Sequence, residues 1–182
     1  TILYVPLLAQ GTALGAFIVG STSGVRTFSP GQVDLARALA SEIALAVANA
    51  RLFESVQTAN ARLEAAYDAT IEGWSLALEM RDTGTNGHTL RVAALTLALA
   101  RHLGVPEPQL PHLRRGALLH DIGKMAVPDA ILNKPGPLDE AELEHVRAHP
   151  REGARMLALI GTLRAAVPCV LHHHERWDGH GY

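Results

Sequence analysis

The first twenty residues contain two short apolar runs. Residues 2–9 (ILYVPLLA) and 12–20 (TALGAFIVG) are rich in Leu, Ile and Val, and Gln10 and Gly11 separate them. Apolar runs on either side of a turn sequence predict two paired β-strands. Neither run reaches the roughly 18–20 residues that a membrane-spanning helix needs, so we expect no membrane span in this segment.

A long helical pattern follows, from Gly31 to about Arg81. Ser29 suits an N-cap and Pro30 suits the first helical position. Only one further glycine, Gly73, and no proline interrupt the pattern. Apolar residues recur mostly at steps of three, four or seven, which places them on one stripe of a helix. The stripe consists of Leu35, Leu39, Ile43, Val47, Ala50, Phe53, Val56, Leu63, Tyr67, Ile71, Trp74 and Leu78.

A helix of about 50 residues is too long to bury one stripe inside a small domain. We therefore expect a parallel two-chain coiled coil between two modules, and with it a homodimer. The alternative is a pair of separate amphipathic helices that break near residues 58–60.

The remainder of the chain has the pattern of helices joined by short loops. Asp139 and Glu142 have the spacing of a capping box, which predicts a helix that ends near His149. Further helices are expected over residues 88–103, 109–121, 151–160 and 162–174. The predicted fold class is mainly α: an all-helical bundle, preceded by a long helix and a short β-hairpin.

Composition narrows the classes of function. Of the 182 residues, 48% are hydrophobic and 19% are charged, which is sufficient for a packed core. Sixteen Lys and Arg against 18 Asp and Glu give a net charge of −2, so general DNA or RNA binding is disfavoured. Cys169 is the single cysteine, which excludes a disulfide scaffold and fits a cytoplasmic location. Because the chain starts at Thr1 and stops at Tyr182 in a glycine-rich stretch, we expect it to be part of a longer protein.

Histidine is the unusual residue, with ten in the chain. His120 and Asp121 follow an apolar helical run, where a charged carboxylate is costly unless it is paired or bound to a metal. A hydrogen-bonded structural pair is the alternative. His88, His149 and the run 172–174 fall on other predicted helices, as a metal site inside a helical bundle requires. Imidazoles and carboxylates suit first-row metals such as Fe, Mn, Ni or Zn, and so many ligands suggest two ions.

Ordered motifs over residues 77–182 resemble the HD-GYP family, the cyclic di-GMP phosphodiesterases of the HD superfamily. The matching stretches are 77–82 (ALEMRD), 87–92 (GHTLRV), 118–124 (LLHDIGK), 128–136 (PDAILNKPG), His149-Pro150 and 172–182 (HHHERWDGHGY). The resemblance implies an all-helical HD-type metal-binding bundle, incomplete at its C-terminus because the signature ends at Gly181-Tyr182.

The resemblance also implies site residues. The implied metal ligands are His88, His120, Asp121, His149, His173 and His174. Lys124 stands where the family directs a lysine at the substrate phosphate, and Lys124 and Asp121 are the expected catalytic residues. The signature loop contains Asp178, Gly179, Gly181 and Tyr182. His172 is expected to pack, or to bond behind the ligands.

Two departures from the family pattern matter. The family's last metal ligand, an Asp, would lie beyond Tyr182, so residues 1–182 alone are expected to hold metal weakly. Gly84 stands where some members carry a Glu that supports a third metal. We therefore expect two divalent metal ions, Fe or Mn, and not three.

The implied reaction is hydrolysis of cyclic di-GMP to pGpG and/or GMP. A metal-bridging hydroxide would attack the phosphorus in line with the departing 3′ oxygen. Two alternatives keep the fold: an HD phosphohydrolase acting on another nucleotide, and a degenerate module that binds cyclic di-GMP or docks a GGDEF-type partner.

The front of the chain resembles the last third of a GAF sensor domain. The matching stretches are 5–7 (VPL), 14–16 (LGA), 28–30 (FSP) and the helix through 48–52 (ANARL). The expected organisation is the C-terminal part of a GAF domain over 1–55, a signalling linker helix over 56–80 and an incomplete HD-GYP domain over 81–182. The implied protein is a dimeric regulator in which the sensor controls the phosphodiesterase.

Overall fold

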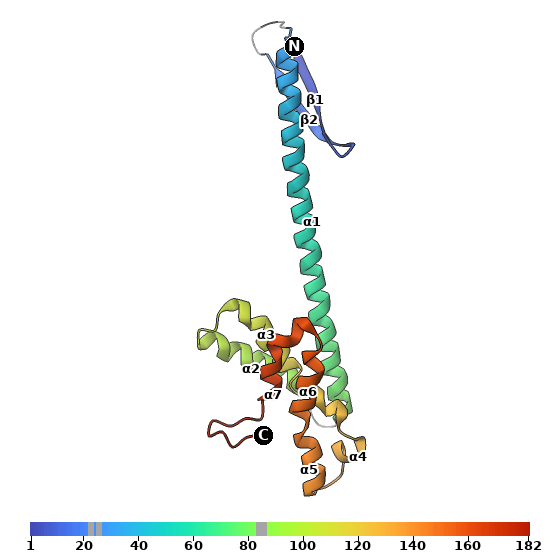
Figure 1. The fold of residues 1–182 in the computed structure, drawn as a ribbon, viewed down its shortest axis with the longest axis vertical. Coiled ribbons are helices and arrows are strands. Elements are labelled where there is room, and N and C mark those ends of the chain that lie inside the picture. The colour runs from blue at the N-terminus through green and yellow to red at the C-terminus, as the bar shows by residue number, and fades with distance from the viewer. Residues whose placement is uncertain (22–23, 25–26, 83–86) are drawn as a thin grey trace. The chain divides into compact units, whose positions relative to one another are not determined.

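Two compact units make up the chain, residues 1–64 and 65–182. The computed structural model describes residues 1–21, 24, 27–82 and 87–182. One helix, α1 (Pro30–Arg81), runs without interruption from the first unit into the second (Figure 1). The alternative of two helices with a break near residues 58–60 is therefore wrong.

The predicted hairpin is present in the first unit. Strands β1 (Ile2–Ala9) and β2 (Thr12–Gly20) pair antiparallel. Gln10 and Gly11 connect them with φ angles of 49° and 80°. Positive φ at both central residues is the conformation of a type I′ turn, whose twist matches that of the flanking strands.

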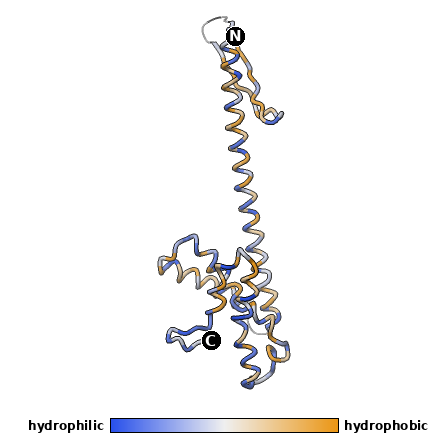
Figure 2. The backbone as a smooth tube through the Cα atoms, viewed as in Figure 1, coloured by the Kyte–Doolittle hydropathy of each residue, from blue (hydrophilic) through white to orange (hydrophobic). Residues whose placement is uncertain are grey.

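One face of the hairpin packs on the start of α1. The core of this unit is formed by Val5, Ala36 and Ala40, with Leu3, Leu7, Phe17 and Val19 partly buried against it. The strand residues alternate along each strand, as one-sided burial requires. In Figure 2, apolar colours predominate along the two strands, whereas apolar and polar colours are mixed along α1.

The second unit is helical. Its elements are the C-terminal part of α1, α2 (His88–His102), η1 (Glu107–Gln109), α3 (Leu110–Leu118), η2 (Ile122–Ala126), α4 (Asp129–Leu132), α5 (Glu140–Arg147), α6 (His149–Ala158), η3 (Gly161–Ala166) and α7 (Val167–Leu171). Their shared core contains Ile71, Ala93, Ala117, Leu118, Leu119, Ile122, Leu157, Leu163 and Val170. The predicted mainly helical fold with a hairpin and a long helix is confirmed. No helix among the described residues has both the length and the apolar character to cross a membrane.

Two helices end earlier than the periodicity predicts. The helix expected over 109–121 ends at Leu118, and the chain tightens into 3₁₀ turns in which Lys124 N donates to the carbonyl of Asp121. The helix expected over 162–174 is a 3₁₀ segment followed by the short α7. Pro168 lies in the first turn of α7, where its missing N–H is tolerated, whereas it could not continue an earlier helix. The predicted capping box of Asp139 and Glu142 is present at the start of α5.

The apolar stripe of α1 is mostly buried in the second unit and largely exposed in the first. Ile71 and Leu78 are buried in the second unit, and Tyr67 packs against its core and hydrogen-bonds Thr162 over 2.6 Å. In the first unit, the stripe residues Leu35, Phe53 and Leu63 are each more than 60% exposed. An apolar row on α1 is therefore left without a partner among the described residues.

Candidate metal centre

Four side chains converge at one point in the second unit. Asp121, His149, His173 and His174 each offer a ligand atom, and these atoms all lie within 4.8 Å of one another. Asp121 lies in the turn after α3, His149 begins α6, and the two other histidines follow α7. His149 is 1% exposed, so the cluster reaches into the interior of the unit.

Hydrogen bonds to the backbone fix three of the histidine rings. Nδ1 of His120 lies 2.8 Å from the carbonyl of Ala117, and Nδ1 of His149 lies 2.6 Å from that of Val146. Nδ1 of His173 lies 2.8 Å from the carbonyl three residues before it. A carbonyl oxygen can only accept, so Nδ1 carries a proton in each of these three rings, and each ring turns its Nε2 toward Asp121. A proton on Nδ1 leaves Nε2 as the ring nitrogen that a metal ion could bind.

The predicted ligands outside the four-residue group adjoin it. The His120 ring lies 5.1 Å from the His173 ring and 5.7 Å from the His88 ring, between ring centroids. His88 is the first residue of α2. The structure therefore brings all six predicted ligands into one continuous set of neighbouring side chains.

The charge states of the cluster suit a cation. Burial acts to raise the pKa of Asp121, but hydrogen bonds with His120, His149 and His173 outweigh it and hold the pKa well below its usual range. Burial, followed by the neighbouring His173 and His149, lowers the pKa of His174 to about 4. A side chain must be deprotonated to bind a metal ion, and the lowered pKa values keep Asp121 and His174 deprotonated at neutral pH. One carboxylate among several imidazole Nε2 atoms is a donor set for first-row transition metals.

Lys124 adds a positive charge at the edge of the cluster. Its Nζ lies 2.9 Å from Oδ2 of Asp121 and 2.9 Å from Oδ2 of Asp82. Burial acts to lower the pKa of Lys124, but the two carboxylates outweigh it and raise the pKa. The ammonium group is therefore retained next to a predicted metal ligand.

Glu79 is a candidate positioning residue that the sequence analysis did not identify. Its buried carboxylate accepts hydrogen bonds from the backbone N–H groups of Gly87 (2.9 Å) and Thr89 (2.6 Å), which flank His88. These N–H groups belong to the unpaired start of α2. Glu79 thus fixes the element that presents His88. These two bonds join residues eight and ten positions apart in the sequence, so no helical spacing indicates them.

A close backbone contact sets the position of Asp121 relative to His149. A Cβ atom on Gly123 would collide with the backbone carbonyl of His149 and lie 2.6 Å from the nitrogen of Gly153. Only glycine allows η2 to approach α6 this closely. The two ligand-bearing segments are thereby held side by side, with Asp121 Oδ1 3.2 Å from His149 Nε2.

The signature loop lies against the cluster. The Tyr182 ring stacks on the His174 ring with centroids 4.6 Å apart and an interplanar angle of 14°. Asp178 accepts from the Arg176 side chain (2.6 Å) and from the backbone N–H of His180 (3.1 Å), and Gly179 has a φ of 75°. Gly181 N donates to the Glu175 carboxylate over 2.9 Å.

The sequence analysis also made predictions about His172 and Gly84. His172 is exposed, so the expectation that it packs is wrong. The turn after Leu171 directs it to the surface, whereas His173 and His174 lie in the cluster. Gly84, the basis for expecting two metals and not three, lies outside the described residues.

The sequence of this chain is similar to a family model and to known proteins. Residues 74–182 match the family model described as an HD domain. A cyclic di-GMP phosphodiesterase of Pseudomonas aeruginosa is 53% identical over 106 residues, which cover 58% of this chain. A cyclic di-GMP phosphodiesterase of Vibrio cholerae is 34% identical over 147 residues (72% of this chain), and a 3'3'-cGAMP-specific phosphodiesterase of that organism is 39% identical over 121 (66%). The matches span only 26–30% of the length of these three relatives.

Proposed function

The chain belongs to the HD-domain family, as its motifs predicted, and on this premise we propose that it is the catalytic part of a metal-dependent cyclic di-GMP phosphodiesterase. One observation carries the proposal: a half-buried carboxylate and three imidazoles converge within 4.8 Å in the segment that matches the HD-domain family model. The relatives named above act on cyclic dinucleotides, as their names state.

The donor set suits a pair of divalent ions, Fe or Mn. Asp121, His149, His173 and His174 would hold them, together with His120 and His88. The chemistry that such ions supply when bound is Lewis acidity, which lowers the pKa of water and offsets charge on phosphoryl oxygens.

The protein's own residues would orient the phosphodiester and stabilise its charge. Lys124 keeps its proton and lies 2.9 Å from Asp121, so its ammonium can pair with a phosphoryl oxygen next to the ligands. Hydrolysis forms a bond from a water oxygen to phosphorus and breaks the bond to the 3′ oxygen, which takes up a proton. The first product is linear pGpG, and a second cleavage would give GMP.

The rest of the chain fits a regulatory role. We propose that residues 1–55 are the C-terminal part of a GAF sensor domain, that 56–80 form a signalling helix and that 81–182 belong to the catalytic domain. The exposed apolar residues Leu35, Phe53 and Leu63 would pair with those of a second copy, giving a homodimer through α1. The free thiol of Cys169 suits the reducing cytoplasm.

The test uses the full-length protein, purified anaerobically with Fe or Mn. Cyclic di-GMP is incubated with this protein and with its Asp121→Ala variant, and pGpG and GMP are quantified by chromatography. Product from the wild type and none from the variant supports the proposal. Hydrolysis of 3'3'-cGAMP without hydrolysis of cyclic di-GMP would mean that the substrate is another cyclic dinucleotide. No hydrolysis at all would favour a module that binds cyclic di-GMP or docks a GGDEF-type partner.

A further inference from the structure

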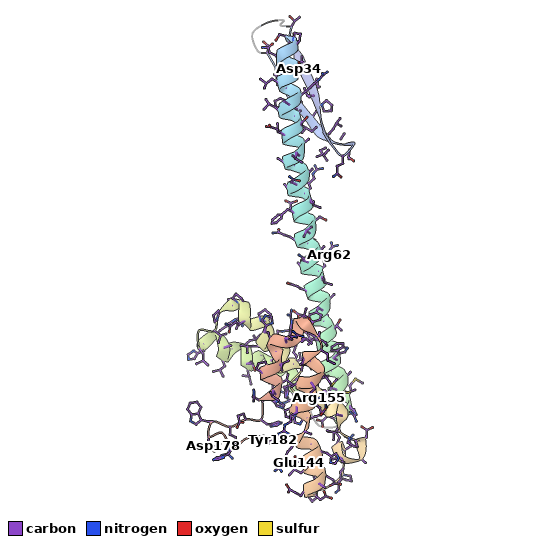
Figure 3. The ribbon with its side chains drawn as sticks, viewed as in Figure 1. Asp34, Arg62, Glu144, Arg155, Asp178 and Tyr182 are labelled. Carbon is purple, nitrogen blue, oxygen red and sulfur yellow. The ribbon has the colours of Figure 1, made fainter. Side chains whose placement is uncertain are left out.

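A cavity of about 540 Å³ lies beside the metal centre. Its walls include Glu144 and Arg147 of α5, Arg151 of α6, and His172, His180 and Tyr182 of the C-terminal segment. Glu144 and Tyr182 are labelled in Figure 3. The volume is within the range of about 300–1,000 Å³ that is typical of small-molecule sites.

The cavity and the metal centre share a wall. The Tyr182 ring lines the cavity and stacks on the His174 ring at 4.6 Å. Pro150, which directly follows His149, lines it as well. A substrate with one phosphate at the metal centre would therefore extend the adjacent part of the molecule into this cavity.

Two polar side chains in the cavity remain available to a ligand. Within the described part of the chain, the side chains of Glu144 and Arg151 form no hydrogen bond or ion pair, and both residues are exposed. Arg147 differs, because its guanidinium bonds Glu140 (3.0 Å) and lies 5.9 Å from the centre of the Tyr182 ring.

The charges in the cavity do not favour a phosphate. Arg147 and Arg151 are balanced by Glu144 and Glu175. An anion would meet carboxylates as well as guanidinium groups, so it would gain little from this lining. A neutral heterocycle that carries both donors and acceptors matches a lining of both signs.

We propose that this cavity binds a guanine base of the substrate, an inference that rests on the proposed function. A carboxylate such as that of Glu144 accepts from the N1–H and N2–H groups of guanine, and a guanidinium such as that of Arg151 donates to O6 and N7. Tyr182 offers a ring on which a base can stack. Adenine lacks both the N1–H and the O6 atom. Glu144 and Arg151 are therefore specificity-determining residues that distinguish guanine from adenine.

The test compares selectivity in the full-length, metal-loaded protein. Values of kcat/KM are measured for cyclic di-GMP and for 3′,3′-cyclic di-AMP with the wild type, Glu144→Gln and Arg151→Ala. Arg155→Ala is the matched control, because Arg155 is on the same helix as Arg151 but outside the cavity, and its guanidinium bonds the Glu152 carboxylate. We expect the preference for cyclic di-GMP to fall about tenfold or more in both cavity variants, mainly through KM, and to be unchanged in the control.

The outcomes separate the two proposals. Wild-type selectivity in both cavity variants, or an equal loss on both substrates, would overturn the guanine site while the phosphodiesterase activity stands. Absence of cyclic di-GMP hydrolysis by the wild type would instead remove the proposed function on which the inference rests.

Discussion

The ammonium of Lys124 lies 2.9 Å from Oδ2 of Asp121, at the edge of the candidate metal centre. A cation at this position has two consequences of opposite sign. It competes with a metal for the carboxylate, and it provides a positive charge for a phosphoryl oxygen. Metal binding and turnover should therefore respond differently to its removal.

Substitution of Lys124 by Met separates these effects. The variant should bind at least as much metal as the wild type, because a competitor for Asp121 is absent. Its kcat should fall by about 10²-fold or more, since one charge-stabilising group is lost. Metal content by plasma mass spectrometry and turnover of cyclic di-GMP check both points. Lys124→Arg should recover part of the turnover, whereas parallel loss of metal and activity in Lys124→Met would mean that Lys124 only supports the structure.

Substitution of Gly123 by Ala should disrupt the candidate metal site by displacing the backbone that positions it. The added Cβ meets the carbonyl of His149, so η2 and α6 must move apart. Overpacking of this kind costs about 1–3 kcal/mol of stability. The melting temperature and the metal content should both decrease. Gly73→Ala is the control, because a Cβ there meets nothing within 4 Å and alanine favours a helix. A Gly123→Ala protein as stable and metal-rich as Gly73→Ala would refute the packing argument.

Glu79 should make stability depend on pH. Burial acts to raise its pKa, but hydrogen bonds from Thr89 and Gly87 outweigh it and hold the pKa below 4.5. A group whose pKa is lower when folded contributes stability above its unfolded pKa, and this contribution is lost as pH falls through the folded pKa. Above about pH 5, the free energy of unfolding of the wild type should therefore be larger than that of Glu79→Gln by a constant amount. This difference between the two proteins should decrease as the pH falls below that value. Denaturant unfolding across pH measures this difference. Glu64→Gln, at an exposed position of α1, should show no such difference.

The proposed coupling through α1 predicts sensitivity to helix rotation. Four extra residues after Thr58 turn the following part of the helix by about 40° relative to the preceding part. The exposed row of the first unit would then no longer align with the catalytic unit in a dimer. Cyclic di-GMP turnover by the full-length protein should change, while the melting temperature of the catalytic unit should not. Unaltered turnover would argue against regulation through α1.

Local sequence patterns predicted the elements whose causes are local. The apolar runs gave both strands of the hairpin, and the uninterrupted periodicity gave α1. The capping box of Asp139 and Glu142 lies where its spacing predicts. These features depend on residues close together in the chain, so the pattern contains the necessary information.

Features that depend on tertiary contacts were not predictable in this way. The early end of α3 at Leu118 accompanies the close approach of Gly123 to α6, which no periodicity encodes. The motifs indicated the candidate ligands, but they could not show that His172 is exposed while its two neighbours face the cluster. The bonds of Glu79 on either side of His88 likewise join two helices, α1 and the start of α2.

The most direct test of the account is a metal titration with activity as the readout. Full-length protein is stripped of metal by a chelator, Mn²⁺ is added stepwise, and cyclic di-GMP hydrolysis and bound metal are measured at each step. We predict no hydrolysis without metal, a rise that saturates as two ions bind per chain, and neither tight binding nor hydrolysis in Asp121→Ala. Hydrolysis by the metal-free protein, or undiminished binding and turnover in Asp121→Ala, would contradict metal-dependent hydrolysis at this site.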